Sequence, residues 1–433
     1  MTTDHDAALA YLDEHIGRGV KPGTDRIRGL LDVLADPHEG YSIVHVAGTN
    51  GKTSTARLVA GLVRAHGLNV GLFTSPHLQR VEERYEVSGE VMSAGEFASA
   101  MADLRPFVDL YEERSGDLVT YFELTAALAF AWFAERTVDV AVVETGLGGR
   151  LDATNVVRAD VSVLTSVGIE HTAYLGDTIE AITTEKVAIL KDEGILVTGL
   201  LAPEAEAVAA ARVEETGSRW LRVGTDVRAA DVVQAVGGWV VDVEGAEASY
   251  DEVQLRTHGR HQVDNLLTAV AATEALFGRP LDLGAVREAA ATVSLPGRME
   301  MVEHDPPLML DGAHNPAGAG ALGAALAREF PTLKWEAVVG AMADKDVEGI
   351  LEGLRGRVTT VRAAAAAESE RAMPADEVAV LAGRVLDVPA TAHPSVAEAL
   401  KVARASGSPV LVTGSLYVVG EARDAFFGSG RSA

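Results

Sequence analysis

A glycine-rich turn near the N-terminus carries the residues best suited to binding phosphate. The segment His45-Val-Ala-Gly-Thr-Asn-Gly-Lys-Thr53 lies between a predicted buried strand and a predicted helix. Glycines let backbone N–H groups approach an anion, and the helix N-terminus adds partial positive charge. Lys52 would then reach the β- and γ-phosphates of a nucleotide, and the Thr53 hydroxyl would meet Mg²⁺. The turn therefore predicts an ATP phosphate loop.

The match to the general phosphate-loop pattern is incomplete. That pattern, G-x-x-x-x-G-K-[ST], fails at one position because residue 46 is Val. The alternative is a glycine-rich structural turn followed by a solvent lysine. We favour the phosphate loop because Gly48, Gly51, Lys52 and Thr53 all stand where phosphate binding needs them.

Polar residues also follow three neighbouring predicted strands. Ser75, Glu144 and His171 each come at or just after a strand's carboxyl end. Ligands of open α/β sheets bind at this edge, and Mg²⁺ prefers oxygen ligands. Singly, the serine is consistent with a turn and the histidine with a hydrogen-bonded structural group. Together they predict a magnesium site, whereas Lys186 by itself is typical of a helix lysine paired with a nearby glutamate.

Alternating strands and helices must position these residues. Strands are predicted at 42–47, 69–74, 139–143, 161–166 and 194–198, and helices at 53–66, 121–135, 178–191 and 262–276. This alternation predicts an α/β fold with a mostly parallel sheet. Residues 239–243 and 252–256 are predicted to form a small antiparallel edge. We expect a first domain at 1–295 that binds ATP.

A second, smaller Rossmann-like α/β domain is expected at 296–433, and the family resemblance given below implies that glutamate is ligated there. The alternation restarts there with strands at 308–310, 336–339, 358–361 and 410–413 and helices at 317–329, 347–353, 375–381 and 396–405.

Composition narrows the class of protein. The 433 residues carry 37 Lys and Arg against 63 Asp and Glu, a net charge of −26. This charge repels nucleic acids and anionic membranes. The absence of cysteine excludes disulfides and thiolate metal sites. With no signal peptide pattern and no run of roughly 18 apolar residues, we expect a cytoplasmic monomer without nucleic-acid or membrane partners.

Stretches along nearly the whole chain resemble the folylpolyglutamate synthase/dihydrofolate synthase branch of the Mur ligase superfamily. The long run from Glu144 to Asn155 and the ending Gly414-Ser-Leu-Tyr417 are specific to this branch, whereas the phosphate loop is shared by the superfamily. The other matching stretches are 74–78, 120–123, 168–172, 175–179, 185–186, 261–265, 295–298, 310–316 and 344–346.

The resemblance implies roles for individual residues. ATP would be bound by Asn50, Gly51, Lys52, Thr53, Asn265, Arg298 and Asp311. Mg²⁺, as one or two ions, would be held by Thr53, Ser75, Glu144 and His171. Lys186 would be carbamylated, which turns a cation into an anionic oxygen ligand. The catalytic set would be Lys52, His171, Lys186, Arg298 and His314.

A pterin-binding site is implied by three further segments. Phe122 is available to stack on the flat ring. The implied contacts are Thr24, Asp25, Thr120, Tyr121, Phe122, Glu123, Leu151, Asp152 and Ala153. The segment Gly23-Thr-Asp-Arg26 departs from the usual Gly-Leu-Glu-Arg, and Val187-Ala-Ile189 from the usual Ala-Gly-Ile. Thr53 stands where this branch usually has glycine, as in the peptidoglycan Mur ligases.

The implied reaction joins L-glutamate to dihydropteroate or a reduced folate through an acyl phosphate made from ATP. Whether the first glutamate, later ones or both are added stays open. A peptidoglycan-type Mur ligase, favoured by Thr53, needs an N-terminal domain for a UDP-sugar, but the first strand begins at Ser42. A P-loop phosphotransferase without ligation leaves the Leu310-Asp-Gly-Ala-His-Asn-Pro316 stretch unexplained.

Overall fold

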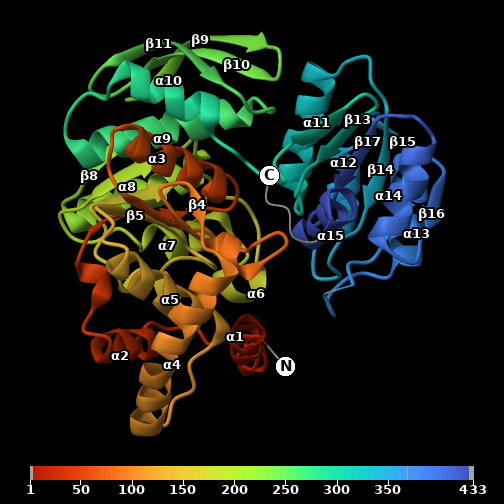
Figure 1. The fold of residues 1–433 in the computed structure, drawn as a ribbon. Helices are drawn as coiled ribbons and strands as arrows, with labels where there is room; N and C mark the ends of the chain where they lie inside the picture. The colour runs from red at the N-terminus through yellow and green to blue at the C-terminus, as the bar shows by residue number, and fades with distance from the viewer. Residues whose placement is uncertain (1–2, 368, 429–433) are drawn as a thin grey trace.

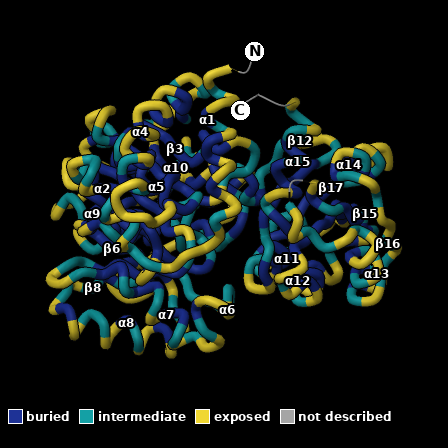
Figure 2. Tube along the Cα trace, turned by 90° about the horizontal axis from the view of Figure 1, so that it is seen from below, coloured by how far each residue is buried: buried dark blue, intermediate teal, exposed yellow. Residues whose placement is uncertain are grey.

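The fold was obtained as a computed structural model, in which residues 3–367 and 369–428 are described. Figure 1 shows two lobes, the second formed by the C-terminal part of the chain. Buried segments run through the interior of both lobes, and exposed segments lie around their rims (Figure 2). None of the helices within the described ranges combines the length and apolar character needed to cross a lipid bilayer.

An eight-stranded sheet forms the centre of the first lobe, in the order β4-β3-β2-β5-β1-β6-β7-β8. Six strands are parallel, and β3 and β4 add an antiparallel edge. The predicted mostly parallel sheet is thereby confirmed. The strands are β1 (Ser42–Ala47), β2 (Val70–Phe73), β3 (Tyr85–Val87), β4 (Glu90–Val91), β5 (Val140–Glu144), β6 (Val161–Leu164), β7 (Ile195–Thr198) and β8 (Arg219–Arg222).

Both faces of this sheet are covered because its strands alternate between two cores. Val44 and Val46 of β1 enter the core with α3, α9 and α10. Ile43 faces the opposite core, with α1, α2, α4 and α5. The helices are α1 (Asp4–Asp13), α2 (Asp25–Val33), α3 (Lys52–Ala65), α4 (Ala94–Ser115), α5 (Tyr121–Glu135), α6 (Thr172–Leu175), α7 (Ile179–Val187), α8 (Pro203–Thr216), α9 (His261–Phe277) and α10 (Leu283–Thr292).

The predicted antiparallel strands belong to a separate three-stranded sheet. It comprises β9 (Arg228–Ala235), β10 (Gly238–Glu244) and β11 (Ser249–Leu255), in the order β11-β10-β9. Trp239, Val241 and Val243 alternate along β10 and pack into the core shared with α9 and α10. These strands therefore lie over helices instead of extending the large sheet.

The second lobe contains a six-stranded sheet in the order β12-β13-β17-β14-β15-β16. Only β12 is antiparallel to its neighbour. Helices α11, α12 and α13 cover one face, and α14 and α15 the other. The elements are β12 (Glu300–His304), β13 (Pro307–Leu310), α11 (Pro316–Glu329), β14 (Trp335–Val339), α12 (Val347–Gly353), β15 (Val358–Ala363), α13 (Ala375–Leu386), β16 (Ala390–Ala392), α14 (Val396–Ala405), β17 (Val410–Thr413) and α15 (Leu416–Phe427).

Candidate active site between the two lobes

The phosphate loop joins β1 to α3 with its lysine folded back on the loop. Lys52 Nζ donates to the carbonyl oxygens of Gly48 at 3.1 Å and Thr49 at 3.3 Å. Gly51 has φ +86°, and a Cβ there would lie 2.5 Å from Asn265 Oδ1. Glycine at this position therefore allows α9 to bring Asn265 against the loop. The backbone N–H groups at the start of α3 face the same space.

Three of the predicted magnesium residues meet beside this loop. Glu144, at the end of β5, is 1% exposed. Its carboxylate accepts from the Thr53 hydroxyl at 2.9 and 3.0 Å and from the Ser75 backbone N–H at 3.3 Å. Burial raises the pKa of Glu144, and the nearby positive charge of Lys52 opposes that rise. The cluster follows from the strand order β2-β5-β1, which brings three carboxyl ends together.

The fourth, His171, lines the same cavity but lies beside Glu170. His171 Nε2 is 4.0 Å from Glu170 Oε1, and burial lowers the pKa of His171 to about 4. It precedes α6 with φ +51°. Among the described residues, no group of three or more His, Asp or Glu side chains is arranged around a common metal position. A metal here would need the hydroxyl oxygens of Thr53 and Ser75 beside Glu144.

Lys186 is a buried lysine and not a solvent-exposed helix residue. It is 2% exposed, and its Nζ donates to Gly48 O at 2.8 Å. The neighbouring Glu185 pairs with Arg150 instead. Burial lowers the pKa of Lys186 to about 7, Lys52 adds to the effect, and Glu170 opposes it. The interpretation of Lys186 as a lysine paired with a nearby glutamate on its helix is therefore wrong.

The second lobe completes the cavity. Asp311, at the end of β13, accepts N–H bonds from Met299 and Ala313, both at 2.9 Å. Burial raises its pKa, and Arg298 opposes the rise. His314 Nδ1 donates to Gly312 O at 2.8 Å, which leaves Nε2 as the acceptor.

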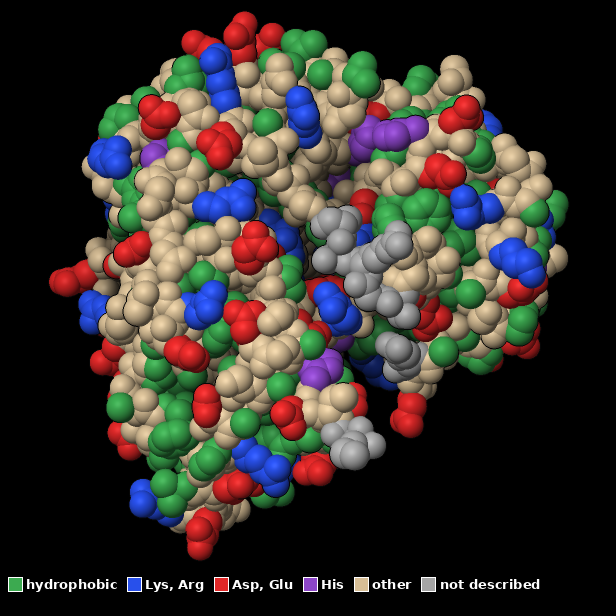
Figure 3. Space-filling view, viewed as in Figure 1, with side chains coloured by type: hydrophobic (Ala, Val, Ile, Leu, Met, Phe, Trp, Pro, Cys, Tyr) green, Lys and Arg blue, Asp and Glu red, His purple; other side chains and the backbone are tan. Residues whose placement is uncertain are grey.

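The cavity between the lobes has a volume of about 500 Å³. It is lined by the ATP, metal and catalytic residues named from the sequence: Asn50, Gly51, Lys52, Thr53, Ser75, Glu144, His171, Lys186, Asn265, Arg298, Asp311 and His314. On the face drawn in Figure 3, the surface is hollowed between the lobes, with basic and histidine side chains along the hollow.

Two residues were not singled out from the sequence: Glu170, which lines the cavity, and Asn315, which follows the lining residue His314. Asn315 Nδ2 donates to Asn50 Oδ1 at 3.1 Å and to Glu170 Oε2 at 3.3 Å, so it joins the lobes. Glu170 lies among Lys52, Lys186 and the two histidines, whose charges lower its pKa. Glu170 follows the carboxyl end of β6, and this position could have identified it as a candidate site residue. The contact of Asn315 depends on how the lobes pack, which no local pattern records.

The three predicted pterin segments lie together. Gly23 N–H donates to Leu151 O at 3.2 Å, and Arg26 Nε pairs with Glu123 at 3.0 Å. Thr24 and Asp25 stand between those two contacts, at the start of α2. Phe122 packs beside Gly146, where a Cβ would lie 2.5 Å from the ring.

Several of these pterin-segment residues also have local structural roles. Thr120 precedes Tyr121, the first residue of α5, and forms a capping box with Glu123. Asp152 is buried and accepts from Leu147 N–H at 2.7 Å and from Thr154, beside Ala153.

The fold and cavity define a Mur ligase, the class of ATP-dependent amide-forming ligases. The sequence pattern of the Mur ligase middle domain matches residues 46–273, and that of the Mur ligase glutamate ligase domain matches residues 297–416.

Similar proteins define the branch. The dihydrofolate synthase/folylpolyglutamate synthase of Mycobacterium tuberculosis is 37% identical, over 94% of this chain and 90% of its own. The folylpolyglutamate synthase of Lacticaseibacillus casei is 34% identical, over 93% and 94%. A solved M. tuberculosis folylpolyglutamate synthase complexed with ADP and AMPPCP has a TM-score of 0.93 at 35% identity, covering 99% of both chains. The protein belongs to the dihydrofolate synthase/folylpolyglutamate synthase family.

Proposed function

We propose that this protein adds L-glutamate to dihydropteroate, to reduced folates or to both, through an acyl phosphate formed with ATP. One observation carries the proposal: a phosphate loop, the buried carboxylate of Glu144 and the second-lobe residues Arg298 and Asp311 face one cavity. Family membership supplies the substrate class. The cavity lies beside the segments proposed to bind the pterin.

The proposed ATP site draws on both lobes. Asn50–Thr53 and Asn265 belong to a proposed first domain at 1–295, and Arg298 and Asp311 to a proposed second domain at 296–433. Nucleotide bound between them would hold the lobes together and exclude water from the acyl phosphate. Lys52 would leave the Gly48 and Thr49 carbonyls to reach the phosphates.

We assign Mg²⁺ to Thr53, Ser75 and Glu144, whose hydroxyl and carboxylate oxygens suit that ion. His171, on the other side of the cavity, suits a second ion. When bound, Mg²⁺ neutralises charge on the phosphates. The Thr53 hydroxyl and the Ser75 backbone N–H both donate to Glu144, which brings the three residues together.

Carbamylation of Lys186 is part of the proposal. Because its pKa is about 7, a large share of the amine is neutral near pH 7 and can attack CO₂. The N–C bond forms, a proton is released, and an anionic carbamate results. That anion would remove the repulsion between Lys186 and Lys52 and supply an oxygen ligand.

The reaction requires two transfers. The substrate carboxylate attacks the γ-phosphate, and ADP leaves; the glutamate amine then attacks the acyl carbon, and phosphate leaves. Lys52 and Arg298 would stabilise charge on the transferred group. We assign His314 to accept the amine proton, because burial lowers its pKa and its Nε2 is free to accept.

The remaining contacts complete the proposal. Phe122 would stack on the pterin, with Thr24, Asp25, Thr120, Tyr121, Glu123 and Leu151–Ala153 around it. The net charge of −26 supports a protein without nucleic-acid or anionic membrane partners. A cytoplasmic monomer stays a prediction from the sequence, which size-exclusion chromatography with light scattering tests for the oligomeric state.

A co-substrate assay tests the function. ADP release is measured with dihydropteroate plus glutamate, with tetrahydrofolate plus glutamate, and with UDP-muramoyl substrates. We expect stimulation by one or both folate pairs and none by the UDP-muramoyl substrates. ADP release that no folate pair raises above background would contradict the proposal.

A further inference from the structure

A polar network that the proposed reaction does not use joins the two lobes. It connects the loop that follows Ser75 to β12 and α15 of the second lobe. Its members are Gln79, Glu300, Arg423 and Asp424, called here the Arg423 network. Gln79 belongs to the loop after β2, Glu300 begins β12, and Arg423 and Asp424 lie on α15. The reaction proposed above does not use Arg423.

Gln79 uses both ends of its amide in this network. Its Oε1 accepts from Arg423 Nε at 2.9 Å, and its Nε2 donates to Asp424 Oδ1 at 2.7 Å. Arg423 is 4% exposed and also donates through Nη1 to Glu300 Oε1. Glu300 Oε2 accepts the backbone N–H of Gly297 at 2.8 Å. One guanidinium thus connects the first-lobe loop to the residue preceding Arg298.

Close packing holds the same loop against α15. A Cβ on Gly420 would lie 2.0 Å from the Leu78 carbonyl oxygen, so the helix backbone touches the loop backbone. The Leu78 side chain packs into the second-lobe core that contains Val418 and Val419. A residue of the first lobe therefore completes the core of the second.

The loop is itself rigid between this contact and Ser75. The Glu83 carboxylate accepts backbone N–H bonds from Leu78, Gln79 and Arg80 at 2.9 to 3.3 Å. Ser75 at the other end donates its N–H to Glu144. We expect a shift at Gln79 to reach Ser75, because hydrogen bonds hold both ends of this short segment.

We propose that Arg423 is a positioning residue. It fixes the position of Ser75 in the first lobe relative to Arg298, which lies beyond the domain boundary. This rests on the proposed function, in which Ser75 serves Mg²⁺ and Arg298 serves ATP. Among the described residues, the side chain of Arg423 hydrogen-bonds to Gln79 and Glu300, and not to the phosphate loop or Arg298. It acts through Gln79 on one side and through Glu300 and Gly297 on the other.

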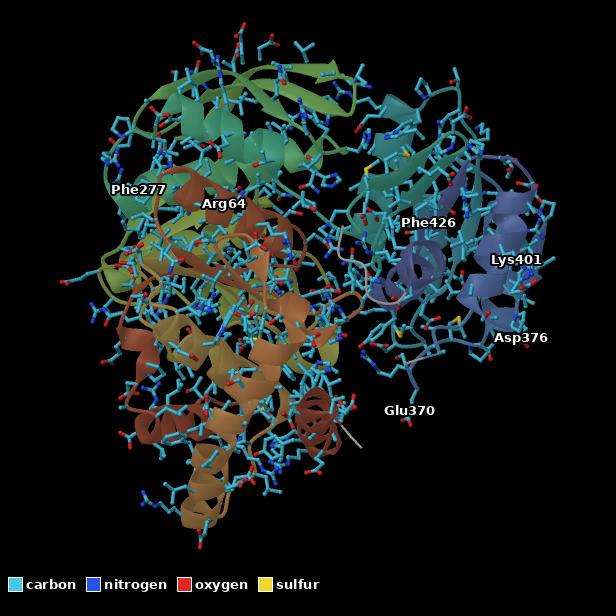
Figure 4. The ribbon with its side chains drawn as sticks, viewed as in Figure 1. Arg64, Phe277, Glu370, Asp376, Lys401 and Phe426 are labelled. Atoms are coloured by element: carbon cyan, nitrogen blue, oxygen red, sulfur yellow. The ribbon has the colours of Figure 1, made fainter. Side chains whose placement is uncertain are left out.

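Two variants break the network in different places. Arg423→Lys keeps the positive charge, but a single ammonium group cannot replace both the Nε bond to Gln79 and the Nη1 bond to Glu300. Gln79→Ala removes the amide from the other side. Arg404→Lys is the matched control, because Arg404 also pairs with a carboxylate, Glu303, and lies over the ring of Phe426 at 5.0 Å. Phe426 lies within the second lobe, as labelled in Figure 4.

Calorimetry with Mg²⁺ and a non-hydrolysable ATP analogue gives a readout besides turnover. Arg423→Lys and Gln79→Ala are each expected to weaken binding about tenfold and to lower kcat about 10- to 100-fold. Arg404→Lys is expected to change neither. Binding and kcat within twofold of wild type in both network variants, or an equal loss in Arg404→Lys, would overturn the proposal. If Arg423→Lys does not fold, Gln79→Ala decides.

A double variant that exchanges the amide and the carboxylate between residues 79 and 424 distinguishes a positioning role from a general effect on stability. Gln79→Glu combined with Asp424→Asn keeps both hydrogen bonds, with donor and acceptor reversed between residues 79 and 424. Binding within about threefold of wild type is expected for the pair, and a loss as large as in Gln79→Ala contradicts the proposal. Wild-type protein that binds the analogue but shows no folate-dependent ADP release refutes the proposed function, while the binding series still decides the role of Arg423.

Discussion

The cavity edge of the large sheet and the three-stranded sheet β9–β11 differ in how deeply their charged side chains are buried. At the cavity edge, Glu144 and Lys186 are almost fully buried. On the three-stranded sheet, the Arg228–Glu244 pair is 62% and 41% exposed, and most buried positions, such as Trp239, Val241 and Val243, are apolar. Burying charge costs stability, and exposed pairs contribute little. The difference indicates that the first region is shaped by chemistry and the second by packing.

The largest expected effect tests whether the cavity edge is catalytic. Lys52→Ala removes the ammonium group that would contact the phosphates, so kcat should fall about 10³-fold or more. The fold should remain, because the Lys52 ammonium donates its hydrogen bonds to two loop carbonyls and is not part of a hydrophobic core. Folate-dependent ADP release measures kcat, and far-UV circular dichroism measures whether the fold remains. Near-normal turnover in this variant would remove the phosphate loop from the mechanism.

Lys186→Met sharpens the comparison by separating stability from activity. We expect turnover to be lost and the free energy of unfolding at pH 7 to rise by about 1–2 kcal/mol, since a buried amine becomes apolar. The pKa of Lys186 is lowered from 10.5 to about 7 on folding. Its stability contribution is therefore complete above pH 10.5 and is lost as the pH falls toward 7.

Urea unfolding in CO₂-free buffer measures this dependence for Lys186. Wild type should gain stability between pH 7 and the onset of alkaline unfolding, relative to Lys186→Met. Lys191→Met is the control, because Lys191 is a less buried lysine outside the cavity whose pKa is lowered to about 8. It should keep its activity. Parallel stability curves for wild type and Lys186→Met would refute a depressed pKa at Lys186.

Asn315→Ser tests the bridge between the lobes. Serine keeps an oxygen to cap α11, as Asn315 Oδ1 does for the Gly318 N–H at 2.8 Å, but loses the amide donor to Asn50 and Glu170. The loss of one hydrogen bond should raise the KM for ATP about fivefold, with kcat and the melting temperature little changed. An unchanged KM for ATP would show that the bridge does not contribute to nucleotide binding.

The smallest expected effect lies on the three-stranded sheet. Arg228→Ala removes an exposed ion pair and should change the free energy of unfolding by less than about 0.5 kcal/mol. Activity should stay at the wild-type level. Thermal melting measures the change in stability, and ADP release measures the activity. A large loss of activity here would break the distinction between the two regions.

Local pattern was enough to predict the phosphate loop and the strand ends. Glycine spacing fixed the turn before Lys52, and parallel pairing explains why Ser75 and Glu144 meet. The long helix α4 was not predicted, although Ser93 and Glu96 form a capping box at its start. Its hydrophobic positions pack against several other helices, so they do not form one regular stripe.

The rest of the site depends on contacts between distant parts of the chain. Asn315 reaches Asn50, and Lys186 reaches Gly48, across separations that no sequence window covers. Composition alone favoured pairing of Lys186 with a nearby glutamate, whereas the folded chain buries it against Gly48. Glu170 was in view within a matching stretch, but its closeness to Lys52 and Lys186 required the folded chain.

The contact between Gly420 and Leu78 gives an engineer a means of separating the two halves of the enzyme. No side chain fits between α15 and the loop, so a single added methyl group in Gly420→Ala acts as a wedge between them. Small-angle X-ray scattering would register the separation as an increase in the radius of gyration. The space at one alpha carbon thus limits how closely α15 can approach the first-lobe loop.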